Sequence, residues 1–169
     1  MFVGHLGVGL GLKKAAPEVN LGLLVFAAFL LDVLLGLFVL LGLEQIHVPA
    51  NYAQLHYLRF TFPSSHGLLA SLLWAAVAFI ISTALWPHNA VNRTRAGLVV
   101  GAAVWSHWTG DAIEHVPVPL MGANSPTVGL SLWNHLGIAI GLELLLTVGV
   151  SSAISRRSRT PAARPAMGC

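Results

Sequence analysis

The chain of 169 residues is 56% hydrophobic and only 9% charged, whereas a soluble globular domain carries about 25% charged residues. This composition excludes an ordinary soluble domain, and the length leaves no room for a second domain. The net charge of +3 comes from short basic clusters between apolar runs, a pattern typical of membrane topology signals and not of a nucleic-acid-binding surface. Cys169 is the single cysteine, so an intrachain disulfide and a Cys-rich metal motif are excluded.

The first predicted element is a short apolar helix over residues 2–12. A helix of this length is about 16 Å long, roughly half the thickness of the hydrocarbon core of a bilayer. Its glycines, at positions 4, 7, 9 and 11, allow close packing on a neighbouring membrane helix. We therefore expect this helix to pack against the rest of the molecule.

Four longer apolar segments follow, and each is near the ~20 residues that a helix needs to cross a bilayer. They cover residues 21–43, 66–86, 96–115 and 130–154. The predicted fold class is therefore all-α: an integral membrane bundle of four transmembrane helices with the short N-terminal helix packed against it, in one domain over residues 1–154. Residues 155–169 carry four arginines and have little apolar surface to bury, which predicts a disordered basic tail.

The distribution of basic residues predicts the orientation of the chain. Eight of the nine Lys and Arg residues fall on one side of the predicted spans, and only Arg59 falls on the other. Positive residues are enriched on the cytoplasmic side of membranes. We therefore expect a plasma-membrane protein, in bacteria one of the inner membrane, with a cytoplasmic tail and with loops 44–65 and 116–129 facing outward.

The third predicted span carries a polar stripe. His107, Asp111 and His115 follow one another at i, i+4 and i+8, so they lie on one face of a helix. Gly97 and Gly101 continue this face as a Gly-x-x-x-Gly pair, which lets another helix approach closely. The stripe is therefore predicted to face protein.

Other polar residues fall at a similar depth. Asp32 lies near the middle of the first span, where an aspartate costs about 2.5 to 3.5 kcal/mol unless it is paired or faces a cavity. Counting the rise along each helix places His5, Asp32 and His107 near mid-depth and His66 farther outward. Neutral imidazole and carboxylate are ordinary ligands of zinc, manganese and iron, and a bound cation would neutralise the carboxylates. The pattern predicts a divalent metal site in the outer half of the bundle, with proton conduction by Asp32 as the alternative.

Two polar residues of the fourth span are outside this prediction. Glu143 lies about 180° around the helix from Asn134, which favours a separate polar contact or an oligomer interface. His135 is either a sixth ligand or a residue that opens the helix.

Four short motifs occur in order within residues 2–135: Gly4-His5, Leu31-Asp32, Ser65-His66-Gly67-Leu68-Leu69 and Ser106-His107-Trp108-Thr109-Gly110-Asp111. Together they resemble the YdjM/YbcI group of membrane-bound metal-dependent hydrolases. The resemblance implies a small helical membrane domain with five metal ligands: His5, Asp32, His66, His107 and Asp111. Many members have a second aspartate where this chain has Leu34, so one metal ion is expected instead of two.

The resemblance also implies an activity, metal-assisted hydrolysis. The cation, with zinc as the first expectation, would polarise a substrate oxygen and lower the pKa of a bound water to about 7. Glu114 and His115, just outward of the implied ligands, are the candidate catalytic general bases. The outer location suits a substrate that arrives from the outer leaflet, such as a lipid-linked molecule.

A second enzyme class is an alternative. Pro63-Ser64-Ser65-His66 and His107-x-x-x-Asp111 resemble two motifs of the type 2 phosphatidic acid phosphatases, which bind phosphate through Lys and Arg without a metal. This chain has Gly101 where the arginine of that family would fall, and it lacks the Lys-x6-Arg-Pro motif. It therefore lacks the cations on which such phosphate binding depends.

A third interpretation is not enzymatic: a proton or metal relay, or a scaffold that forms a homo-oligomer through its Gly-x-x-x-Gly face. The expected partners are thus the lipid bilayer and, in this interpretation, further copies of the chain; no nucleic acid is expected. The implied ligands should converge within coordination reach in a metal enzyme and diverge in a scaffold.

Overall fold

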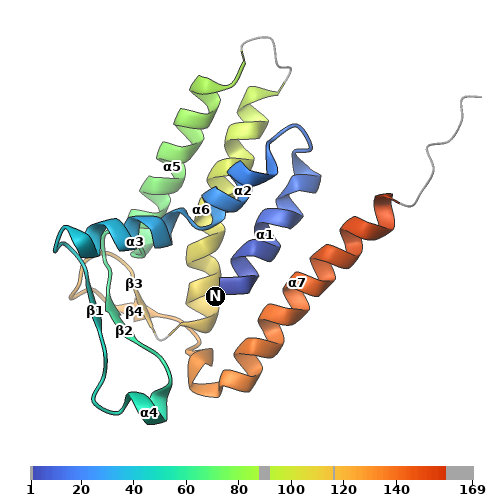
Figure 1. Cartoon of the computed structure of the whole chain (residues 1–169). Coiled ribbons are helices and arrows are strands. Elements are labelled where there is room, and N and C mark those ends of the chain that lie inside the picture. The colour runs from blue at the N-terminus through green and yellow to red at the C-terminus, as the bar shows by residue number, and fades with distance from the viewer. Residues whose placement is uncertain (1, 88–91, 116, 159–169) are drawn as a thin grey trace, which may run out of the picture.

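The computed structural model describes residues 2–87, 92–115 and 117–158 of the chain. In these residues the protein is mostly helical, and small sheets lie at one end of the helices (Figure 1). The helices are α1 (Phe2–Ala15), α2 (Leu21–Ala28), α3 (Leu30–Leu40), α4 (Tyr52–Leu55), α5 (Leu68–Leu85), α6 (Arg93–Glu114), η1 (Leu132–His135, a 3-10 helix) and α7 (Leu136–Ser158). The strands are β1 (Gln45–His47), β2 (Arg59–Thr61), β3 (Val118–Pro119) and β4 (Thr127–Val128).

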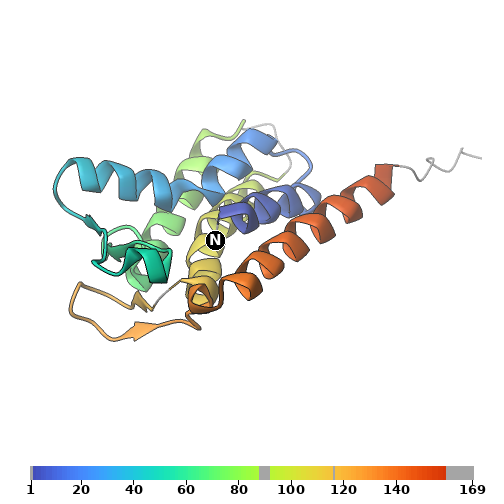
Figure 2. The same ribbon diagram turned by 60° about the horizontal axis from the view of Figure 1, so that its bottom comes forward.

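Helix α6 lies at the centre of the molecule, and α1, α2 and α5 pack around it (Figures 1 and 2). Its buried apolar face packs against α2 and the start of α3 in a cluster that contains Leu24, Ala27, Leu31, Ala96, Val100, Ala103 and Val104. Three polar residues farther along α6, His107, Asp111 and Glu114, are buried as well. They therefore contact protein instead of lipid.

The Gly-x-x-x-Gly pair of α6 faces α5, so the predicted close approach of a second helix occurs within the chain. A Cβ on Gly97 would lie 2.9 Å from the carbonyl oxygen of Phe79, and a Cβ on Gly101 would lie 3.0 Å from that of Ala75. Larger residues would force the α5 backbone away. Glycine at these positions thus sets how closely α5 and α6 pack.

The segment predicted as one helix over residues 21–43 is broken. α2 ends at Ala28, α3 begins at Leu30, and the pair is bent by 53°. The carbonyl oxygen of Ala28 accepts a 2.7 Å hydrogen bond from Nδ1 of His107, so a buried side chain satisfies a backbone group at the break. α3 then leaves the bundle (Figure 1). Asp32 falls in the first turn of α3, where the helix N-terminus favours a carboxylate.

The two loops predicted to face outward each contain a short antiparallel pair of strands, which the all-α prediction missed. β1 pairs with β2, with Ile46 opposite Phe60, and β3 pairs with β4, with Val118 opposite Val128. Both pairs lie at the end of the bundle where α5 begins and α6 ends (Figure 1). These loops cover the polar end of α6.

Helix α1 packs against α7, α2 and α6, as predicted for the N-terminal helix. A Cβ on Gly7 would lie 3.3 Å from Cα of Thr147 in α7, and a Cβ on Gly9 would lie 3.2 Å from Cα of Val25 in α2. The small glycines therefore allow the close contacts that were expected of them.

Among the described residues, two helical stretches are long and apolar enough to cross a membrane: α5 and the stretch Leu132–Gly149, which includes part of α7. The bent pair of α2 and α3 is a third if it counts as one span. α5 and α7 expose large apolar side chains such as Leu73, Ile80, Leu145 and Val148, as helices in contact with lipid do. α6 is less apolar, so the predicted number of four spans is not confirmed.

Three of the basic residues predicted to be cytoplasmic, Lys13, Lys14 and Arg95, lie at one end of the helices. The guanidinium of Arg95 donates a hydrogen bond to the carbonyl oxygen of Ala15, which joins the start of α6 to the end of α1, where Lys13 and Lys14 lie. α7 continues to Ser158, so residues 155–158 are helical and not part of a disordered tail. The remainder of the predicted tail, residues 159–169, lies outside the described residues.

Candidate metal centre

The five side chains predicted as metal ligands converge beside α6. His5 comes from α1, Asp32 from the first turn of α3, His66 from the turn before α5, and His107 and Asp111 from α6. All are buried except Asp32, whose side chain is 43% exposed. Four separate segments of the chain thus supply one cluster.

Two imidazoles and two carboxylates form the tightest part of this cluster. Nε2 of His66 lies 3.1 Å from Nε2 of His107. Oδ1 of Asp32 lies 3.6 Å from Nε2 of His66 and 3.5 Å from Nε2 of His107. Oδ2 of Asp111 lies 3.5 Å and 3.3 Å from the same two nitrogens. Both histidine nitrogens are therefore within reach of both carboxylates.

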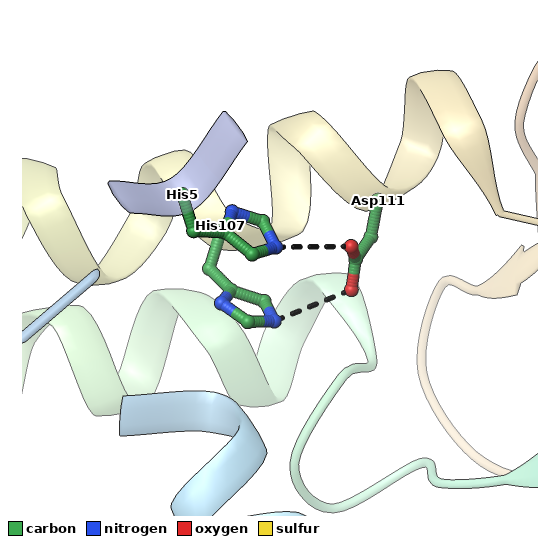
Figure 3. A group of neighbouring side chains, drawn as sticks. All are labelled: His5, His107 and Asp111. Atoms are coloured by element: carbon green, nitrogen blue, oxygen red, sulfur yellow. Dashed lines mark hydrogen bonds and ion pairs between the residues drawn. The ribbon is translucent and has the colours of Figure 1, made fainter. Parts of the chain in front are cut away.

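The second oxygen of Asp111 faces two other histidines. Oδ1 lies 3.2 Å from Nε2 of His5 and 3.7 Å from Nε2 of His115. The rings of His5 and His107 stack with their centroids 3.7 Å apart. Figure 3 shows the two rings side by side, each reaching a different oxygen of Asp111. Asp111 therefore lies between two pairs of histidines.

Two groups of these side chains could hold a metal ion: His5 with His107 and Asp111, and Asp32 with His66 and His107. In each group, one potential ligand atom per residue lies within 4.8 Å of the others. His107 belongs to both groups. They are therefore parts of one site around His107.

A tight turn before α5 positions His66. The backbone N–H of His66 donates to the carbonyl oxygen of Phe62 at 2.9 Å. At the next residue, Gly67, a Cβ would lie 2.5 Å from the carbonyl oxygen of Pro63 and 2.8 Å from that of Met121. Glycine at this position lets the turn close under the β3–β4 loop and keeps His66 against α6.

A pocket of about 190 Å³ opens onto the cluster. Its walls are formed by His5, Asp32, Leu35, Phe60, Phe62, His66, Asp111, His115 and Trp133. None of these lining residues is a lysine or an arginine. The cluster therefore adjoins a space large enough for part of a small molecule, with carboxylates and imidazoles as its polar groups.

The two predicted general bases differ in their positions. His115, at the C-terminal end of α6, lines the pocket, and its ring centroid lies 3.8 Å from that of Trp133. Glu114 is buried on another side of α6, where it shares a hydrogen bond with Glu143, and it is not among the lining residues. The structure thus brings His115 to the pocket but not Glu114.

Glu143 makes the separate polar contact that its helix position favoured. Its carboxylate accepts the backbone N–H groups of Val3 and Gly4 at 2.6 Å and 3.2 Å, so it ties α7 to the N-terminus of α1. His135 is exposed in η1 and belongs to neither group of potential ligands.

Sequence reasoning missed Glu44 and Ser65, which are buried next to His66. Oγ of Ser65 donates to Oε2 of Glu44 at 2.7 Å and lies 2.8 Å from Nδ1 of His66. Ser65 belongs to the motif that contains His66, but no role was assigned to it from the sequence. Glu44 gave no signal, because it lies 21 positions before Ser65 in an outer loop, where a glutamate is normally solvated.

No family model, no curated protein and no solved structure matches this chain. The resemblance to the YdjM/YbcI group therefore stays a prediction from the motifs, and the function is inferred from the geometry of the site.

Proposed function

We propose that this protein is a membrane-embedded hydrolase that depends on one divalent metal ion, with zinc as the first candidate. The observation that carries the proposal is the meeting of the His66 and His107 nitrogens with the Asp32 and Asp111 carboxylates at the wall of a pocket. As part of this proposal α6 is the fourth membrane span, and α1, α2 and α5 shield its polar face from lipid.

His107 presents a lone pair to the cluster. Its Nδ1 lies 2.7 Å from the carbonyl oxygen of Ala28, which can only accept, so in the neutral ring Nδ1 carries the proton and Nε2 the lone pair. Ligand atoms that are 2.0–2.1 Å from a tetrahedral zinc ion are about 3.3 Å from one another. The five separations that involve Nε2 of His66 or His107, 3.1 to 3.6 Å, fit that spacing.

The balance of charge also favours a cation. Asp32 and Asp111 bring two carboxylates to a pocket whose lining residues include no lysine or arginine. Two carboxylates that face the same pocket repel each other, and a divalent ion would neutralise both. The same composition argues against the mechanism of type 2 phosphatidic acid phosphatases, which needs Lys and Arg to bind phosphate.

We assign His5 to the support of Asp111 and not to the metal itself, although the family resemblance implies a ligand. Nε2 of His5 lies 3.2 Å from Oδ1 of Asp111, and Nδ1 has no hydrogen-bond partner among the described residues. A neutral ring in this setting gains most by placing its proton on Nε2 and donating it to Asp111. This bond would hold the carboxylate with Oδ2 toward His66 and His107.

A metal ion bound here would polarise a substrate oxygen and activate a water molecule for attack. His115 lines the same pocket and is the residue placed to exchange a proton with the substrate. Phe60, Phe62 and Trp133 give the pocket an aromatic wall. We therefore propose a substrate with an apolar part, such as a lipid-linked molecule whose polar group enters the pocket.

The scaffold interpretation has less support. The predicted ligands converge, and the Gly-x-x-x-Gly face that would have formed an oligomer is occupied by α5 of the same chain. A proton relay would use the same histidines and aspartates without a metal. Metal binding therefore separates the hydrolase from the relay.

The direct test is the metal content of detergent-purified protein, measured by elemental analysis. Wild type is compared with His107→Ala and Asp111→Ala, and His135→Ala is the matched control because His135 is exposed and belongs to neither ligand group. We expect near-stoichiometric zinc, manganese or iron in wild type and control, and its loss in both site variants. Wild type should also cleave at least one chromogenic ester from a panel of phosphate and carboxylic esters.

Two results would contradict parts of the proposal. Folded wild-type protein that holds no metal, and that cannot be reloaded with zinc, manganese or iron, would remove the metal site and favour a proton relay. Protein that retains its metal but cleaves no ester would keep the metal site and remove the hydrolase assignment.

A further inference from the structure

Glu44 is a buried carboxylate that the proposed hydrolytic site does not use directly. It follows α3 and is only 2% exposed. Oε1 accepts the backbone N–H groups of Ser64 and Ser65 at 2.7 Å and 2.8 Å, and Oε2 accepts the hydroxyl of Ser65 at 2.7 Å. Three donated hydrogen bonds hold the carboxylate in one orientation beside the turn that carries His66.

The direction of these hydrogen bonds fixes a proton on His66. The hydroxyl of Ser65 has one hydrogen, and it is donated to Glu44. At its 2.8 Å contact with Nδ1 of His66, Oγ of Ser65 must therefore accept, so Nδ1 carries the ring proton. Nε2 of the neutral ring then presents its lone pair toward His107, Asp32 and Asp111.

His66 and His107 are thus prepared in the same way by different means. The Nδ1 proton of His107 is donated to a backbone carbonyl at the break between α2 and α3. A backbone carbonyl cannot reverse its role, but a serine hydroxyl can rotate and donate instead. The carboxylate of Glu44 is what keeps Ser65 in the accepting role toward His66.

We propose that Glu44 is a positioning residue which acts through Ser65 to hold His66 in the tautomer whose Nε2 can bind a metal ion. Partners in this position, which orient a ligand without touching the metal, contribute about 10- to 100-fold to metal affinity. The effect on affinity rests on the proposed metal site. The effect on the tautomer of His66 does not.

The variant that tests this is Glu44→Gln. The amide oxygen can still accept from the backbone, but the amide N–H₂ donates toward Ser65 and turns its hydroxyl toward Nδ1 of His66. We expect the proton of His66 to move to Nε2 and the affinity for zinc to fall by about 10- to 100-fold. Glu18→Gln, the same chemical change at an exposed position outside the site, should change neither.

The tautomer is read from the ¹⁵N NMR spectrum of metal-free, histidine-labelled protein in detergent, in which protonated and unprotonated ring nitrogens resonate far apart. The His66 signals are those missing from His66→Gln. Zinc affinity is measured by competition with a chelator. Ser65→Ala is the second variant, because it removes the hydroxyl that contacts His66 and keeps both backbone donors to Glu44. It should weaken zinc binding, and the ring proton of His66 should no longer be held on Nδ1.

The two proposals fail in different ways. If His66 keeps its proton on Nδ1 in both Glu44→Gln and Ser65→Ala, the role of Glu44 is refuted, whatever the zinc affinity. If wild type binds no zinc but the tautomer changes as expected, the metal site is refuted and the role of Glu44 stands. If Glu44→Gln fails to fold, the position of the His66 proton in Ser65→Ala decides whether the role of Glu44 stands.

Discussion

At the scale of single residues, the histidines of the site divide according to what their Nδ1 atoms contact. Nδ1 of His66 and of His107 each meets an oxygen acceptor. Nδ1 of His5 and of His115 meets no partner among the described residues. Because a neutral imidazole has one proton, His66 and His107 direct a lone pair from Nε2, and His5 directs an N–H from Nε2 toward Asp111. In the proposed site this division separates His66 and His107, as metal ligands, from His5, which orients a ligand.

Replacement of His5 tests the division. His5→Ala should weaken zinc binding by about 10- to 100-fold. The variant removes a hydrogen bond to Asp111, but it removes no ligand of the metal ion. His107→Ala should abolish binding under the same conditions. Both are measured by competition with a zinc chelator. Complete loss of zinc in His5→Ala, equal to that in His107→Ala, would instead make His5 a ligand.

At the scale of elements, two packing features place the site. At the break between α2 and α3, the carbonyl oxygen of Ala28 accepts a hydrogen bond from His107. A new helix begins at Leu30, with Asp32 in its first turn. The close packing of α5 on α6 then determines how far His66, just before α5, lies from His107. A shift of either element would separate atoms that are now 3.1 to 3.6 Å apart.

The α5–α6 contact is tested by Gly97→Ala. The added methyl group would lie 2.9 Å from the carbonyl oxygen of Phe79, and overpacking of this kind costs about 1–3 kcal/mol. Gly141→Ala is the matched control in α7, where a Cβ has no neighbour within 4 Å. The free energy of unfolding, measured by titration with a denaturing detergent, should fall in Gly97→Ala only. Equal stability of the two variants would contradict the close packing.

At the scale of the whole molecule, the two ends of the bundle differ in character. The end of α1, with Lys13 and Lys14, meets the start of α6, with Arg95, at one end of the bundle. The strand pairs lie toward the other end, where α6 finishes (Figure 1), and the pocket-lining residues Phe60, Phe62 and His115 belong to the same end. A membrane protein with cytoplasmic basic loops would thus open its pocket toward the outer side.

This orientation predicts the accessibility of single cysteines. Cys169 is the only cysteine of the chain, and a membrane-impermeant maleimide should label it in spheroplasts only after permeabilisation. In a Cys169→Ser background, Asn124→Cys, at an exposed position in the β3–β4 loop, should be labelled in intact spheroplasts. The reverse pattern would show the opposite orientation.

Much of the helical arrangement was predictable because it depends on local properties. Long apolar runs predicted the bounds of α5, α6 and α7 to within six residues, and i, i+4 spacing placed His107 and Asp111 on one buried face. The break at Phe29 was not predictable, since residues 21–43 are uniformly apolar apart from Asp32 and contain no proline. The hydrogen bond that satisfies the Ala28 carbonyl at the break comes from His107, 79 positions farther along the chain.

The sequence by itself determined that the chain is mostly helical, that some of its helices suit a membrane, and which imidazoles and carboxylates are too costly to face lipid. These are properties of composition and spacing, which each segment carries alone. Only the tertiary structure decided which of these groups meet, how the hydrogen bonds of each ring assign its proton, and that Glu44 reaches His66 through Ser65. The reason is that the direction of a hydrogen bond depends on partners from other segments, and the residue pattern of one segment does not show which partners it will meet.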